Sequence, residues 1–198
     1  MQARIHTPED EQDEQLMERL ISGEDKALDI IIDKYGKEIF NLHLRYTNNY
    51  EDADDLAQET FVRLYFNKNK FSKKYRFKTW LYTIAMNLAR NHYRWKKRHL
   101  NISIDADPEE EDEWVPGIAI STKTDPLKES INRELGNAID EAMNLLPEDQ
   151  REAIVLCELQ DLSLAEAAQV LNTTVKTVES RLYRARKTLR EKLKHYLD

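Results

Sequence analysis

The sequence predicts an all-helical protein with two small helical domains joined by a flexible acidic linker. Its 198 residues include only four glycines and five prolines, a composition that favours helices over sheets. Apolar residues recur at intervals of three and four in both halves of the chain, which is the spacing of one buried helix face. Residues 100–126 lack this period and are rich in acids, so we expect them to form the linker.

The first domain is expected over residues 12–99, after a disordered tail of residues 1–11. Its helices are indicated by apolar stripes within residues 16–21, 27–35, 39–46, 53–64 and about 78–96. Turn-forming residues at Ser22-Gly23 and Asn48-Asn49 separate these stripes. A basic, aromatic loop precedes the last and longest helix.

The second domain is expected over residues 127–198, beginning with a helix that runs to Leu145. Pro147 lies at a favoured early position of the next helix, whose first turn holds Glu148, Asp149 and Gln150. Residues 163–186, SLAEAAQVLNTTVKTVESRLYRAR, have the pattern of a helix-turn-helix. Leu164, Ala167, Ala168 and Leu171 form the stripe of its first helix.

The turn and second helix of this motif suggest a major-groove reader of DNA. Asn172 tolerates the left-handed conformation that closes a helix, and Thr173 is a suitable cap for the next one. The expected buried face holds Val175, Val178, Leu182, Ala185 and Leu189; the opposite face holds Lys176, Ser180, Arg181, Tyr183, Arg184 and Lys187. Because two short amphipathic helices also occur in proteins that bind no DNA, the motif needs support from the rest of the chain.

Charge is strongly segregated along the chain, although the net charge is −7. Residues 61–100 contain 12 basic and no acidic side chains, and residues 176–198 contain 8 basic and 3 acidic ones. The segments before and between these blocks are acidic. Forty residues without an acid, in a chain that is 34% charged, indicate a polyanionic partner.

The first basic block also interleaves aromatic rings with lysine and arginine. Basic side chains follow a nucleic-acid backbone and aromatic faces stack on bases that have left the duplex, so this block points to single-stranded or melted DNA. Trp80, Leu81, Ile84, Ala85 and Leu88 are expected to be the helix's core face. Asn87 lies on the polar face, where its amide can donate to and accept from the edge of an extruded base.

An acidic cluster comprises Asp52, Asp54, Asp55 and Glu59, of which Asp52, Asp55 and Glu59 lie on one helical face. We expect no metal or cofactor there, since no nucleophile, histidine pair or phosphate-binding loop accompanies it. A patch that docks a basic protein partner and a merely solvated face are both consistent with it.

Cys157 lies in an apolar helical context and is expected to be a buried hydrophobe. No apolar run approaches 18 residues, and we expect a cytoplasmic protein with no membrane insertion of its own.

Four motifs, in order, resemble a bacterial RNA polymerase sigma factor of the extracytoplasmic-function group: YEDADDLAQETFVRLY, FKTWLYTIAMNLARNHYRWKKR, an acidic linker, and LPEDQREAIVLCELQDLSLAEAAQVLNTTVKTVESRLYRARKTL. The resemblance implies that residues 12–99 are region 2 and residues 127–198 are region 4. It implies a non-enzymatic protein that binds core RNA polymerase, melted minus-ten DNA and duplex minus-thirty-five DNA. It also implies an anti-sigma factor as a candidate partner, although no residue here identifies one.

Site residues follow from the same resemblance. The positions that bind core polymerase in the family hold Asp52, Asp55, Gln58 and Phe61 in this chain. The positions that bind the minus-ten element hold Phe71, Lys73, Lys74, Tyr75, Lys78, Asn87 and Arg94. The positions that bind the minus-thirty-five element hold Thr174, Lys176, Thr177, Glu179, Ser180, Arg181, Tyr183 and Arg184. Lys176 and Glu179 depart from residues common in the family, so promoter preference cannot be borrowed from relatives. A stand-alone helix-turn-helix regulator is the alternative, but it accounts for the C-terminal motif alone.

Overall fold

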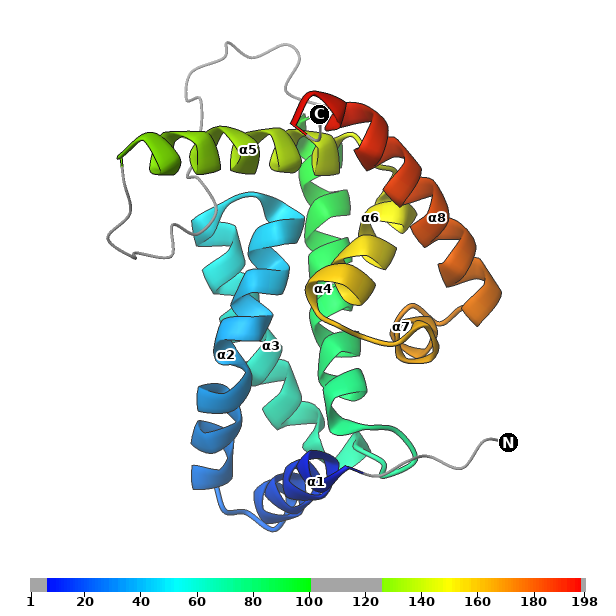
Figure 1. Cartoon of the computed structure of the whole chain (residues 1–198). Coiled ribbons are helices and arrows are strands. Elements are labelled where there is room, and N and C mark those ends of the chain that lie inside the picture. Colours follow the sequence, from blue (N-terminus) through cyan, green and yellow to red (C-terminus); the bar gives the residue numbers. More distant parts are fainter. Residues whose placement is uncertain (1–6, 101–125, 197–198) are drawn as a thin grey trace.

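The computed structural model describes residues 7–100 and 126–196, and within these ranges the protein is helical with no strands (Figure 1). The helices are α1 (Pro8–Ile21), α2 (Lys26–Thr47), α3 (Tyr50–Asn67), α4 (Phe77–Leu100), α5 (Pro126–Asn144), α6 (Glu148–Ile154), α7 (Leu164–Val170) and α8 (Val175–Lys192). The all-helical prediction is confirmed. The expected linker, apart from its first and last residues, and residues 1–6 of the expected tail lie outside the described residues.

Helix α4 is the central element (Figure 1). Helices α2 and α3 lie along one side of it, while α6 and α7 lie on the other with α8 beyond them. Buried apolar side chains from both halves of the chain form one continuous cluster, in which Leu81, Ala85 and Ala89 of α4 take part. The two parts predicted from the sequence therefore pack directly against each other in the described residues.

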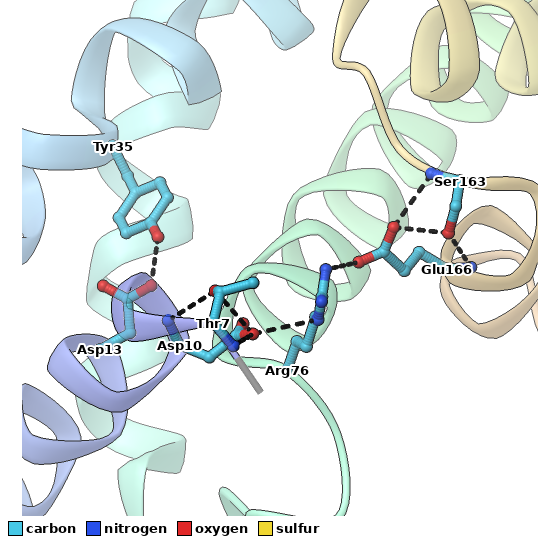
Figure 2. A network of polar contacts seen from close by, with 7 residues as sticks. All are labelled: Thr7, Asp10, Asp13, Tyr35, Arg76, Ser163 and Glu166. Atoms are coloured by element: carbon cyan, nitrogen blue, oxygen red, sulfur yellow. Dashed lines mark hydrogen bonds and ion pairs between the residues drawn. The ribbon is translucent and has the colours of Figure 1, made fainter. Parts of the chain in front are cut away.

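Helix α1 begins earlier than the sequence suggested. Residues 8–11 were expected in the disordered tail, but they form its first turn. Thr7 caps this turn: its Oγ1 accepts from the Asp10 N–H at 3.2 Å, while the Asp10 carboxylate accepts from the Thr7 N–H at 3.0 Å. Asp13 is buried, accepting a 2.5 Å hydrogen bond from the Tyr35 hydroxyl (Figure 2). A polar composition concealed these partners, and the predicted boundary at residue 12 is wrong.

Two other boundaries differ from the sequence prediction. The stripes at residues 27–35 and 39–46 belong to one continuous helix, α2, which passes through Gly36. In the second half, Thr174 rather than Thr173 caps α8, accepting from the Thr177 N–H at 3.2 Å. Asn172 has the expected left-handed backbone (φ 50°), but the turn continues one residue further before the helix begins.

No helix in the described part of the chain combines the length and apolarity needed to span a bilayer.

His43 is a fully buried histidine in the first half of the chain, and its burial predicts acid sensitivity. Its Nε2 lies 3.0 Å from Thr60 Oγ1, and Thr60 donates its own proton to the Leu56 carbonyl. The ring is therefore neutral with a proton on Nε2. Burial lowers the pKa of His43 to about 3.

Because the pKa of His43 is lower in the folded state, the unfolded chain binds more protons below pH 6.5, and stability falls as the pH falls from there toward 3. We expect His43 to cost about 2 kcal/mol of unfolding free energy between about pH 7.5 and about pH 5. Denaturant unfolding at several pH values measures this loss. His43→Gln should remove that part of the pH dependence, and parallel profiles for the two proteins would contradict the assignment.

Candidate nucleic-acid and polymerase interfaces

A groove of about 880 Å³ runs between α2 and α3. Its walls combine apolar rings with polar side chains, among them Phe40, Tyr50, Asp54, Gln58, Phe61, Val62, Tyr65 and Phe66. Phe66 is 79% exposed and Tyr50 is 55% exposed, unusual values for aromatic side chains on a helical bundle. An open apolar groove of this kind is typical of a protein-binding surface.

The four residues predicted to bind polymerase are divided between this groove and its surroundings. Gln58 lines the groove, and Phe61 lines it with a ring that is only 6% exposed. Asp55 is exposed on α3 but does not line the groove. Asp52 faces α4 instead, where its Oδ2 lies 3.1 Å from His92 Nε2 and 3.2 Å from Lys96 Nζ. The acidic cluster is therefore not one continuous surface.

Sequence reasoning missed two exposed apolar members of the groove, Val62 and Phe66. Val62 and Phe66 lie four and eight residues after Gln58, so they share its face of α3. The core stripe of that helix, which includes Leu56 and Leu64, lies on another face. The sequence did contain a signal for this surface: Val62 and Phe66 are two apolar residues at helical spacing that lie outside the core stripe of α3.

The predicted minus-ten residues lie on α4 and the loop before it. Lys73, Lys74, Tyr75, Asn87 and Arg94 are exposed. Phe71 and Lys78 are partly covered: the Phe71 ring packs 5.4 Å from that of Trp80, and Lys78 Nζ lies 3.2 Å from Glu38. Tyr75 is thus the more open ring of the loop, while Phe71 supports the loop's conformation.

The predicted core face of α4 is partly corrected. Leu81, Ala85 and Leu88 are buried as expected, but Trp80 and Ile84 are only partly buried. Trp80 lines a cleft of about 630 Å³ whose opposite wall is the turn between α7 and α8, including Asn172 and Thr174. The loop before α4 and the helix-turn-helix therefore share one cleft.

The helix-turn-helix has the predicted outer face. Lys176, Glu179, Tyr183 and Arg184 are exposed on α8, with Tyr183 at 70%. Ser180 accepts a 2.9 Å hydrogen bond from Arg184, which holds two predicted base-contacting side chains together. Thr174 and Thr177 pair through their hydroxyls at 2.8 Å. Val175 is 45% exposed, so its predicted inward orientation is wrong: it lies in the first turn, beyond the contacts of the core.

Polar contacts tie the helix-turn-helix to the first half of the chain (Figure 2). Arg76, just before α4, lies between two carboxylates: Asp10 of α1 at 3.3 Å and Glu166 of α7 at 2.8 Å. Glu166 also accepts from the Ser163 backbone at 2.9 Å as part of the α7 capping box. Burial alone would raise the pKa of Glu166, but the hydrogen bonds from Ser163 and Arg76 hold it below its usual value.

Family models match two separate parts of this chain. Residues 31–99 match "Sigma-70 region 2" and residues 136–189 match "Sigma-70, region 4". The first match contains most of the groove and of α4, and the second contains the helix-turn-helix.

Several curated proteins are similar over nearly their whole length. "RNA polymerase sigma-H factor" of Pseudomonas aeruginosa is 34% identical over 187 residues, which cover 94% of this chain and 96% of that protein. "ECF RNA polymerase sigma factor SigW" of Bacillus subtilis is 34% identical, with 87% and 91% covered. "ECF RNA polymerase sigma-E factor" of Escherichia coli is 34% identical, with 91% and 94% covered.

Two solved structures have the same arrangement of helices. The sigma factor RpoE of Bartonella quintana, solved with the anti-sigma factor NepR, has a TM-score of 0.67 at 25% identity, with 85% of this chain and 98% of that chain covered. CnrH, solved with the cytosolic domain of CnrY, has a TM-score of 0.67 at 24% identity, with 92% and 97% covered, and shows the fold. Sequence and structure agree: the chain belongs to the sigma-70 family of RNA polymerase sigma factors, in the extracytoplasmic-function (ECF) group.

Proposed function

We propose that this protein confers promoter specificity on core RNA polymerase by binding the enzyme, duplex minus-thirty-five DNA and melted minus-ten DNA. The observation that carries the proposal is that the region 2 and region 4 matches occur in order in one chain, each with a face of exposed donor side chains. The domains expected over residues 12–99 and 127–198 are the proposed functional units, and the start of α1 extends the first of them to Pro8. The proposal assigns the protein no catalytic step: it acts by shifting the equilibrium between closed and open promoter DNA.

The groove between α2 and α3 is the proposed docking site for core polymerase. Its exposed rings supply apolar area, while Asp54 and Gln58 supply a polar edge, linked by a 2.9 Å hydrogen bond. This combination of apolar centre and polar rim is typical of protein interfaces. Phe61 contributes through the shape of the groove, because its ring is almost fully buried.

Region 2 is proposed to capture the melted strand on the exposed face of α4 and its preceding loop. Lys73, Lys74 and Arg94 would neutralise phosphates, and Tyr75 offers an open ring for stacking. The Asn87 amide is exposed, and its Oδ1 lies 3.4 Å from Arg90 Nη1, which orients it. That orientation suits recognition of an extruded base edge.

Region 4 is proposed to read duplex DNA with the outer face of α8. Lys176, Glu179 and Arg184 reach out from successive turns of this helix. Arginine binds guanine through two hydrogen bonds, and glutamate accepts from the amino group of cytosine. Lys176 and Glu179, which differ from residues common in the family, are therefore the side chains proposed to set the promoter preference of this chain. The relative solved with NepR supports an anti-sigma factor as a further proposed partner.

The proposal predicts that the two DNA functions separate by mutation. Asn87→Ala should reduce open-complex formation roughly tenfold, or about 1.4 kcal/mol, and leave duplex binding by region 4 unchanged. Arg184→Ala should weaken upstream duplex binding by about 1–3 kcal/mol and relax its sequence preference. Run-off transcription with core polymerase on a library of genomic promoters, together with footprinting of the melted strand, measures both effects.

The wild-type protein, assayed with and without core polymerase, provides the controls for this experiment. Wild type without core polymerase should direct no transcription, whereas a stand-alone regulator would bind its operator tightly without the enzyme. Failure of the wild-type chain to bind core polymerase would falsify the proposed function. Equal loss of both activities in Asn87→Ala would mean that Asn87 supports the fold instead.

A further inference from the structure

Three acidic side chains of α6 face arginines from both proposed DNA-binding helices. Glu152 Oε1 lies 2.7 Å from Arg90 Nε, and Glu148 Oε1 lies 3.3 Å from Arg94 Nε, both on α4. Asp149 Oδ2 lies 3.1 Å from Arg181 Nε on α8. We call Glu148, Asp149 and Glu152 the acidic strip. All three acids and all three arginines line a single cleft of about 350 Å³.

One of the three pairs in this cleft is largely buried, whereas the Arg94 and Asp149 side chains of the other two are 59% and 45% exposed. The Glu152 side chain is 5% exposed and that of Arg90 is 20% exposed, so water and salt screen this pair poorly. The hydrogen bond to Glu152 raises the pKa of Arg90, because it favours the charged guanidinium. Removing only one partner of such a pair leaves an uncompensated charge, and this strongly destabilises the contact.

The closed arrangement is incompatible with simultaneous reading of both promoter elements. Their names place them about 25 base pairs apart, which is roughly 85 Å of duplex at 3.4 Å per base pair. In this structure the α7–α8 turn shares a cleft with the loop before α4, and two acids of the strip, Glu148 and Glu152, pair with arginines of α4. The two DNA-binding parts must therefore separate before both can engage a promoter.

We propose that the acidic strip is an internal substitute for DNA phosphates, which holds the protein closed by occupying arginines that DNA would otherwise bind. Carboxylates and phosphates both accept charge-assisted hydrogen bonds from guanidinium groups, so DNA competes directly for Arg94 and Arg181. The inference rests on the proposed function, because it assumes that α4 and α8 bind DNA.

A second contact closes the other end of α4. Arg76 pairs with Glu166 of α7 at 2.8 Å and with Asp10 of α1 (Figure 2). Eighteen residues separate Arg76 from Arg94, or about 27 Å of helix. Carboxylate–arginine pairs thus hold region 4 at both ends of α4. The acidic strip contacts arginines of both DNA-binding helices, whereas the Arg76 contact involves neither.

The test compares two variants with the same change in net charge. Glu148→Gln, Asp149→Asn and Glu152→Gln together remove the strip; Glu134→Gln, Glu141→Gln and Glu191→Gln together remove three exposed acids elsewhere in region 4. Fluorescence energy transfer between dyes at Gln12→Cys and Lys194→Cys, in a Cys157→Ser background, reports closure of the full chain. Affinity for a random-sequence DNA duplex is measured on the same proteins.

We expect the strip variant to lose energy transfer at about 50 mM salt, as wild type does only at several-fold higher salt. We also expect it to bind the duplex at least tenfold more tightly than the control variant. Unchanged energy transfer, or equal gains in DNA affinity for the two variants, would overturn the proposal. The energy-transfer measurement contains no DNA, so it tests closure even if promoter binding fails.

Exchanging the charges of Arg90 and Glu152 distinguishes loss of this ion pair from misfolding. Arg90→Glu and Glu152→Arg should each open the protein alone, because each places like charges together. Combined in one chain, they restore an opposite-charge pair and should recover at least half of the lost energy transfer. Failure of the combined variant to close, while its helix content matches wild type, would also count against the strip.

Discussion

Replacing Phe66 with glutamate is expected to abolish binding to core RNA polymerase while the protein stays folded. The Phe66 side chain is 79% exposed, so the substitution removes little packing within the chain itself. In the bound state, however, the new carboxylate would lose its hydration where the exposed Phe66 ring now offers apolar contact area, and this desolvation opposes binding. We expect a loss of affinity of roughly a hundredfold, or about 2.7 kcal/mol, in titrations of labelled protein into core polymerase.

Tyr196→Glu provides the matched control, because it places the same charge at an exposed aromatic position near the end of region 4. This control should bind core polymerase as wild type does. Phe61 is unsuitable for the experiment, since its ring is 6% exposed and its loss would damage the core. Wild-type affinity of Phe66→Glu would show that the groove is not the docking site.

Arg151→Met is expected to give the largest loss of stability. The Arg151 guanidinium is buried and donates to the carbonyls of Met143 at 3.2 Å, Asn144 at 3.0 Å and Leu146 at 3.4 Å. It thereby satisfies backbone acceptors where α5 ends. Methionine fills much of the same volume but donates nothing, so buried carbonyls would be left without partners.

The same guanidinium lies 5.0 Å from the ring of Tyr93 and 5.9 Å from that of Tyr46, both in the first half of the chain. Adding these contacts, we expect Arg151→Met to lower the free energy of unfolding by about 3 kcal/mol in a denaturant titration. Arg186→Met is the control: Arg186 pairs with Glu158 on the exposed surface, and its loss should cost at most about 0.5 kcal/mol. Similar losses for both variants would contradict the role assigned to Arg151.

Local sequence patterns predicted the helices well because their causes are local. The stripe of Ala57, Phe61 and Leu64 places α3 correctly, since side chains three and four residues apart share one helix face. The left-handed Asn172 was predictable for the same reason. The start of α1 was not, because its stability depends on Arg76 and Tyr35, more than 20 residues away. Val175 was misplaced because periodicity gives a face but not the extent of the core that covers it.

The sequence by itself determined the helical fold, the two basic segments and the outer face of α8, because periodicity and charge are properties of consecutive residues. Only the tertiary structure decided which charges are paired. Glu148 and Asp149 are indistinguishable in sequence from ordinary acids in the first turn of a helix, yet they face Arg94 and Arg181. Such pairing depends on how helices distant in the chain pack together. That packing also placed Phe66 in an open groove and closed region 4 against α4.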